Sequence, residues 1–165
     1  MQTTLIKNNF ESAQLNNQCC QYSLMAYSIN TKGSSNLMPP IELARFQAKE
    51  PMEDTIIRWM HRIISNKQQF SVQLVQHIDA VTGKLRIGIV DTTPFIQLAA
   101  QLSVVNQYIG SYDCPEMQLN IRPQMHIPQS EFVFDGVFHI NEFVLLKKEH
   151  AFDAYKQLNV FGLRP

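Results

Sequence analysis

The sequence lacks the features that mark several common classes of protein. Its three cysteines, Cys19, Cys20 and Cys114, include no Cys-x-x-Cys spacing, so neither a zinc ribbon nor a disulfide framework is expected. An odd number of cysteines without paired spacing favours reduced thiols. No stretch reaches 18 consecutive apolar residues, which argues against a transmembrane helix. The GxxxxGKS/T and GxGxxG motifs are absent, so the two common phosphate-cradling loops are not expected either.

An excess of charge is also missing. The chain has 14 Lys and Arg residues against 14 Asp and Glu residues. Without a net charge, no long-range field draws the molecule toward nucleic acid or an anionic membrane surface. The first 18 residues contain neither a basic segment nor an apolar core, so we expect no signal peptide there. We therefore predict a cytoplasmic location and no membrane partner, and leave nucleic-acid binding open.

Short periodic segments of apolar residues are present and predict the secondary structure. Two segments have helical spacing, at residues 51–69 and 93–109, with Pro51 and Pro94 near their starts and Thr93 as a predicted N-cap. The apolar stripes of these helices are Met52, Ile56, Met60, Ile63 and Ile64, then Phe95, Leu98, Leu102, Val105 and Ile109. Alternation and β-rich composition predict strands at 20–29, 39–48, 70–78, 84–90, 117–129, 137–149 and 157–165. Few crossover helices and many hairpin-like neighbours predict an α+β fold with mainly antiparallel sheets.

Two short extended segments contain the residues with the most chemical interest, "PPIEL" at 39–43 and "RPQMHIPQ" at 122–129. Residues two apart on a strand face the same side, so Pro40 shares a face with Glu42, and Gln124 shares one with His126. If the two strands face each other, Glu42 and His126 approach across the space between them. A carboxylate and an imidazole so placed could act as a base, a proton relay or half of a metal site.

These segments, together with "PFIQLAAQLSVVNQYI" and the tail "FVLLKKE…LNVFGLRP", resemble the two-histidine phosphoesterase superfamily of 2′-5′ RNA ligases and cyclic phosphodiesterases. The resemblance runs from about Gln21 to Pro165. It implies a single domain at 21–165 after an N-terminal arm at 1–20. It also implies two pseudo-symmetric lobes of sheet around a central cleft, with helices outside. The segments 30–38 and 130–136 are too short for two helices that family members usually have.

In that family each lobe presents a His-x-Thr or His-x-Ser strand, whose histidines act as general base and acid while the hydroxyl groups bind phosphate. Here the first motif falls on "PPIEL" and the second on "PQMHI". The histidine positions hold Pro40 and Gln124, and the hydroxyl positions hold Glu42 and His126. Proline has no titratable group and glutamine does not exchange a proton near neutral pH. We therefore predict that ordinary two-histidine catalysis is lost.

The predicted function is a non-catalytic module that binds a nucleotide, a phosphoester or a protein partner. One alternative is an active phosphodiesterase that uses His126 and Glu42. Another is a structural or assembly module, including a homo-oligomer. We predict no cofactor and no metal.

The candidate cleft residues are Glu42, Gln124, His126, Arg122 and Arg45. Each has a simpler interpretation that competes with a functional one. Glu42 fits a solvated strand carboxylate paired with Arg45 or Arg122, and His126 fits a polar residue of a vestigial cleft. Other histidines, such as the one in "HID" and the one in "HIN", fit ordinary sheet surfaces.

Overall fold

The computed structural model describes residues 18–28, 40–123, 125–126 and 136–165, and within these ranges it contains two helices and nine strands. In chain order these are β1 (Cys19–Tyr27), β2 (Ile41–Lys49), a 3-10 turn η1 (Glu50–Met52), α2 (Glu53–Ile64), β3 (Phe70–Ile78), β4 (Leu85–Ile89), α3 (Thr93–Gly110), β5 (Gln118–Leu119), β6 (Met125–His126), β7 (Gly136–Ile140), β8 (Glu142–Lys148) and β9 (Lys156–Gly162). No helix in these ranges combines the length and apolar character needed to span a bilayer.

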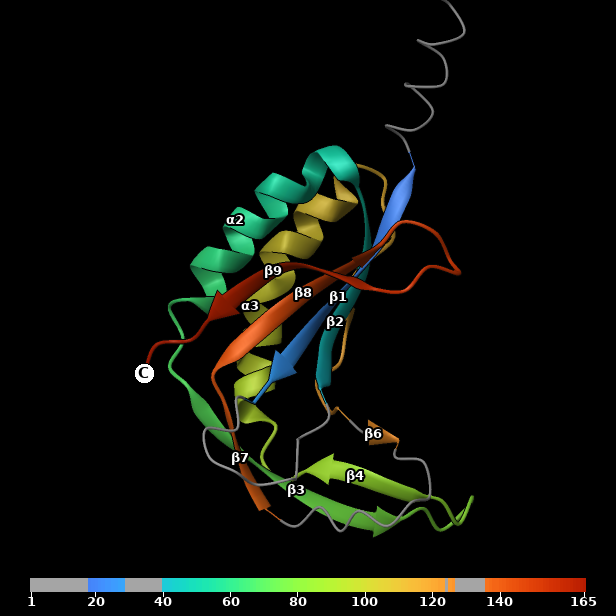
Figure 1. Ribbon diagram of the computed structural model, residues 1–165, viewed down its shortest axis with the longest axis vertical. Helices are drawn as coiled ribbons and strands as arrows, with labels where there is room; N and C mark the ends of the chain where they lie inside the picture. The colour runs from blue at the N-terminus through green and yellow to red at the C-terminus, as the bar shows by residue number, and fades with distance from the viewer. Residues whose placement is uncertain (1–17, 29–39, 124, 127–135) are drawn as a thin grey trace, which may run out of the picture.

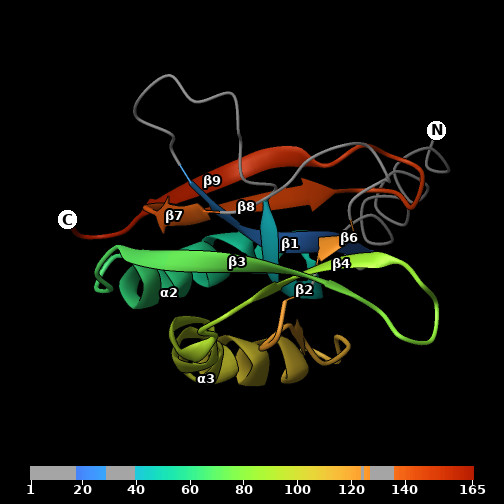
Figure 2. The same ribbon diagram turned by 90° about the horizontal axis from the view of Figure 1, so that it is seen from below.

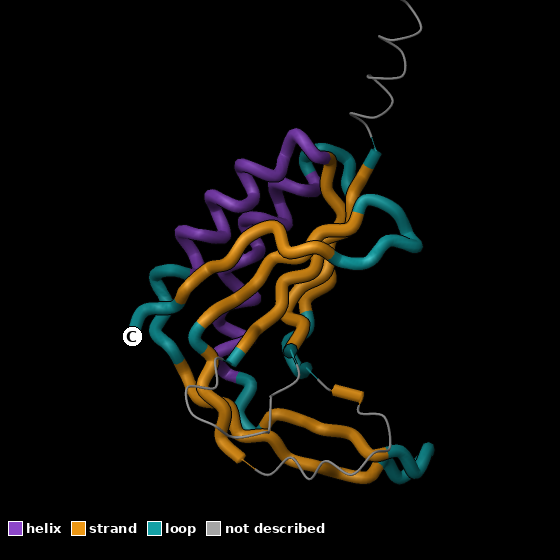
Figure 3. Tube along the Cα trace, in the orientation of Figure 1, coloured by secondary structure: helices purple, strands orange, loops and turns teal. Residues whose placement is uncertain are grey.

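The strands form two separate antiparallel sheets. The larger sheet has the order β5-β2-β1-β8-β9, and the smaller one has the order β6-β4-β3-β7 (Figure 1). Figure 3 shows the strands of both sheets curving around one side of the molecule, with the helices gathered on the other. The predicted two-lobed α+β fold is therefore confirmed.

The helices pack on one face of the larger sheet. Figure 2 shows α2 and α3 on the same side of β1, β8 and β9. Both predicted apolar stripes point into this interface, because every member is buried except Ile63, which is partly buried. Phe95 at the start of α3 packs edge-on against Phe70 of β3, with ring centroids 5.4 Å apart, and so ties the helix to the smaller sheet. Trp59 of α2 likewise packs against Tyr108 of α3 at 5.9 Å.

Both helix starts differ from the prediction. Pro51 lies inside the 3-10 turn that precedes α2, so it does not open the α-helix itself. The N-cap of α3 is Thr92, and Thr93 is already the first helical residue. The side chain that bonds this end is one residue earlier still: Asp91 Oδ1 accepts a hydrogen bond from the Thr93 N–H at 2.9 Å. An acidic side chain just before a helix can bind the free N–H groups as an N-cap does. The threonine at 93 favoured the wrong N-cap residue.

Two predicted strands divide where the chain passes between the sheets. Residues 137–149 form β7 in the smaller sheet and β8 in the larger one, separated at Asn141, whose carbonyl accepts the Leu163 N–H at 2.9 Å. Residues 117–129 supply only β5 and β6 to the two sheets, and 127–129 lie outside the described residues. Alternation records which residues of a segment are buried but does not record which sheet buries them.

Several sequence predictions fall partly or wholly on residues outside the described ranges. These are most of the N-terminal arm, the two segments expected to replace family helices, and Gln124. The last two residues of the predicted arm, Cys19 and Cys20, begin β1. The predicted turn at 79–83 lies within the described residues. There Asp79 Oδ1 accepts the N–H groups of Val81 and Thr82, and Gly83 has a φ of 66°, which favours glycine.

Candidate functional site

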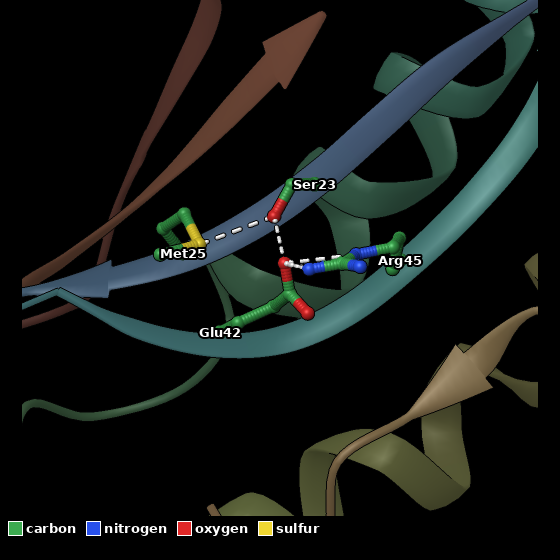
Figure 4. Close-up of polar contacts among 4 residues, drawn as sticks. All are labelled: Ser23, Met25, Glu42 and Arg45. Carbon is green, nitrogen blue, oxygen red and sulfur yellow. Dashed lines mark hydrogen bonds and ion pairs between the residues drawn. The ribbon is translucent and has the colours of Figure 1, made fainter. Parts of the chain in front are cut away.

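A polar cluster marks the first motif segment on the open face of the larger sheet. Ser23 Oγ donates a hydrogen bond to Glu42 Oε2 at 2.7 Å, and Arg45 Nη2 approaches the same oxygen at 3.1 Å (Figure 4). Arg45 Nε adds a second contact to that oxygen at 3.3 Å. Met25 Sδ lies 3.1 Å from the serine oxygen. We call these four residues, Ser23, Met25, Glu42 and Arg45, the Glu42 cluster.

A strand irregularity brings the cluster together. Along β1 and β2, Leu24 pairs with Ala44 and Met25 pairs with Glu42, so Leu43 has no partner of its own. In a regular strand, residues three apart point to opposite faces. The extra residue at Leu43 acts as a β-bulge and lets Glu42 and Arg45 lie on the same face of the sheet. On the neighbouring strand, Met25 pairs with Glu42 and Ser23 pairs with Arg45.

The members of the cluster differ in exposure. Ser23 is only 2% exposed and is the one buried polar residue in the described part of the chain. The side chain of Glu42 is 28% exposed and that of Arg45 is 56% exposed. The hydroxyl therefore fixes the carboxylate from within the sheet surface, and the guanidinium covers it from the solvent side. The structure thus pairs Glu42 with Arg45, one of the two arginines considered from the sequence.

The second motif segment lies beside a surface pocket on the smaller sheet. Arg122 is exposed and Pro123 is buried. They border a pocket of about 330 Å³, whose lining is Val75, His77, Gly88, Ile89, Val90, Thr92, Arg122 and Pro123. We call it the Arg122 pocket. Its walls combine branched apolar side chains with three polar ones, and His77, expected to be an ordinary surface histidine, is one of the three.

The chain reaches the second motif segment from the edge of the larger sheet, next to β2. The Asn120 N–H donates to the carbonyl of Leu43 at 2.8 Å, directly after β5 pairs with Ala44 and Arg45. The chain then enters β6, where His126 pairs with Arg86 of β4. Figures 1 and 2 both place β6 near the beginning of β2. The motif strands therefore belong to different sheets that approach each other here.

Not every predicted site residue is placed by the structure. Pro40 is exposed and immediately precedes β2. Gln124 and the side chain of His126 lie outside the described residues. The approach of Glu42 to His126 therefore stays a prediction.

Two residues of the site were missed by sequence reasoning. Ser23 lies in a strongly apolar strand, and its isolated hydroxyl was the only signal that could have drawn notice. His77 alternates outward on β3, as expected, but its place in a pocket depends on Arg122, which lies 45 positions further along the chain. In the described ranges, no three His, Cys, Asp or Glu residues are grouped to hold a metal ion.

His139 takes part in a separate polar contact on the smaller sheet. Its Nδ1 lies 3.3 Å from Ser71 Oγ, and its Nε2 lies 2.9 Å from Gln69 Oε1. Ser71 and His139 are both exposed, so the group agrees with the surface role expected for this histidine.

Comparison with known proteins supports the fold through structure and not through sequence. Neither a protein-family model nor a curated protein sequence matches the chain. A crystal structure described as a phosphoesterase superposes with a TM-score of 0.60 at 13% identity, over 90% of this chain and all of the other. E. coli LigT complexed with NADP+ gives the same TM-score, identity and coverage. LigT complexed with 3′-AMP gives a TM-score of 0.59 at 13% identity, over 88% of this chain and 99% of LigT.

This chain has a LigT-like fold. The resemblance inferred from the motif segments is thereby confirmed at the level of architecture. In this fold the two motif segments, 84 positions apart in sequence, lie on β2 of the larger sheet and β6 of the smaller one.

Proposed function

We propose that this chain is a LigT-like protein without two-histidine catalysis, which binds a nucleotide or phosphoester ligand beside the motif segments. The sequence supports the first part, because Pro40 and Gln124 occupy the positions where the family mechanism needs histidines. Neither side chain shuttles a proton near neutral pH.

The state of Glu42 is the observation that carries the proposal. A general base needs a carboxylate oxygen directed at the proton that it removes. One of the two carboxylate oxygens of Glu42, Oε2, already accepts hydrogen bonds from both Ser23 and Arg45. This is the arrangement of a carboxylate held in place. Pairing with Arg45 also compensates the negative charge, which otherwise opposes a phosphate group nearby.

The Arg122 pocket has the chemistry that a nucleotide requires. Its volume lies at the lower end of the range of about 300–1,000 Å³ typical of small-molecule sites. Val75 and Val90 offer an apolar surface for a base, and the guanidinium of Arg122 suits a phosphate group. Crystal structures of E. coli LigT hold 3′-AMP, NADP+, phosphate or ATP, so these are the first ligands to test on this chain.

Isothermal titration calorimetry with 3′-AMP, NADP+ and inorganic phosphate tests the binding. Replacing one charge-assisted contact, in Arg122→Ala, should weaken binding by about 10–100-fold. Arg58→Ala is the matched control, because Arg58 is an exposed arginine on α2 outside the pocket lining. No binding by the wild-type chain, or equal losses in the two variants, would contradict the proposed site.

Turnover assays separate this proposal from its alternatives. A 2′,3′-cyclic nucleotide and a 2′-5′-linked dinucleotide should show no hydrolysis above background. A rate that His126→Ala or Glu42→Gln abolishes would instead establish an active phosphodiesterase. A chain that binds none of the ligands and forms a stable oligomer in light scattering would favour the assembly module.

A further inference from the structure

Two of the three cysteines lie next to each other although they are 95 residues apart in sequence. The Sγ atoms of Cys19 and Cys114 are 3.8 Å apart. Cys19 is the first residue of β1, and Cys114 lies in the loop between α3 and β5. We propose that Cys19 and Cys114 form a dithiol site that closes to a disulfide with a low-molecular-weight disulfide such as oxidised glutathione.

The geometry leaves a short movement between the reduced and oxidised forms. A disulfide bond is about 2.05 Å long, so the two sulfurs must approach by about 1.8 Å. Cys19 is partly exposed and Cys114 is 7% exposed. An external disulfide therefore reaches Cys19 first, and the attack by Cys114 is intramolecular and needs no access from solvent.

The backbone next to Cys114 supports a specific placement of this thiol. Asp113 has a φ of 59°, the only positive φ of a non-glycine residue in the described ranges. Such a conformation is uncommon for residues other than glycine, although aspartate tolerates it better than most. The next residue, Cys114, belongs to the hydrophobic core.

The reaction balances in two exchange steps. The Cys19 thiolate attacks one sulfur of oxidised glutathione, and the first glutathione leaves as a thiolate that takes up a proton. Cys114 then loses its proton and attacks the Cys19 sulfur of the mixed disulfide, which releases the second glutathione. Two protein thiols are oxidised to one disulfide, and one glutathione disulfide is reduced to two thiols.

The surroundings of Cys19 set the pH dependence of the first step. Burial and the hydrogen bond with Cys114 raise the pKa of Cys19, Cys20 adds to this effect, and Lys49 opposes it. The thiolate is the attacking species, so the rate should rise about tenfold per pH unit below that pKa. The site is therefore slow at neutral pH and accelerates in mild alkali.

Cys20 provides the matched control. It adjoins Cys19, is 7% exposed, and lies on the other side of the strand. Reduced full-length chain is incubated with oxidised glutathione near pH 8.5, then unfolded for thiol counting and peptide mapping. We expect the thiol count to fall from three to one, with a peptide linking Cys19 to Cys114. Cys20→Ser should keep that link, and Cys114→Ser should stop at a glutathione adduct on Cys19.

The mapping of the wild-type chain decides the matter even if a variant folds poorly. Three thiols remaining in the folded wild-type chain, after glutathione has oxidised a solvent-exposed control dithiol peptide in the same tube, would overturn the proposal. So would a link from Cys20 to either of the other cysteines, or a link between two chains.

Discussion

The buried hydroxyl of Ser23 should stabilise the fold more than the visible ion pair beside it. Replacing Ser23 by alanine removes a hydrogen bond to a charged acceptor, an interaction worth about 1.5–3 kcal/mol. Glu42 is 28% exposed, so water replaces part of the lost contact, and we expect the lower end, about 1.5 kcal/mol. Arg45 is 56% exposed, and an exposed ion pair contributes only about 0–1 kcal/mol.

Thermal and urea unfolding measure this difference. For a domain of this length, 1 kcal/mol shifts the melting temperature by about 2–4 °C. Ser23→Ala should therefore lower it by about 3–6 °C. Arg45→Ala, at about 0.5 kcal/mol in the middle of its range, should lower it by about 1–2 °C. Ser71→Ala is the matched control, because Ser71 is an exposed strand serine whose contact with His139 is open to water, and a surface change of this kind stays within about 0.5 kcal/mol.

Two results would refute this reasoning. If Ser23→Ala is as mild as Ser71→Ala, the buried hydroxyl does not hold the carboxylate. If Arg45→Ala costs more stability than Ser23→Ala, the ion pair dominates, and the charge compensation at Glu42 has to be reassessed.

Two further predictions concern titration. Backbone N–H groups of Thr82 and Val81, together with Arg86, hold the pKa of Asp79 below its usual value. The stabilising effect of Asp79 should be present above its unfolded-state pKa and lost as the pH falls through the lower folded-state pKa. NMR titration of Asp79 and acid unfolding of Asp79→Asn would show this. Burial, and then the hydrogen bond to Glu53 at 2.6 Å, raise the pKa of Tyr22 far above its usual value. The free energy of unfolding should therefore fall as the pH rises beyond about 10. Tyr22→Phe should remove this alkaline loss of stability, while costing about 1–2 kcal/mol at neutral pH in urea unfolding.

Local patterns were sufficient for most of the secondary structure. The stripe that contains Ile56 and Met60 required a helix with one buried face, and the alternation through Val72 and Leu74 required a strand with one buried face. These inferences hold because side-chain periodicity follows directly from backbone geometry. The helix starts were less secure, since the bond from Asp91 to the Thr93 N–H competes with the threonine cap signal.

The candidate site was only partly accessible to such reasoning. Motif position singled out Glu42 and Arg122, and the structure places each beside polar neighbours. Ser23 and His77 also belong to the site, although only an isolated hydroxyl and a "HID" triplet marked them in the sequence, because their partners lie 19 and 45 positions away. A contact of that kind depends on how strands are paired, which no short window of sequence records.

What the amino-acid order determined by itself was the set of elements, their buried faces, and the absence of proton-carrying side chains at Pro40 and Gln124. Tertiary structure alone decided that the chain changes sheets at Asn141. It also decided that Leu43 forms a bulge, which places Glu42 beside Arg45, and that the thiol of Cys19 lies next to that of Cys114. The physical reason is one of range. Periodicity acts between near neighbours, whereas register, bulges and long-range contacts are set by whichever distant segment completes the buried surface.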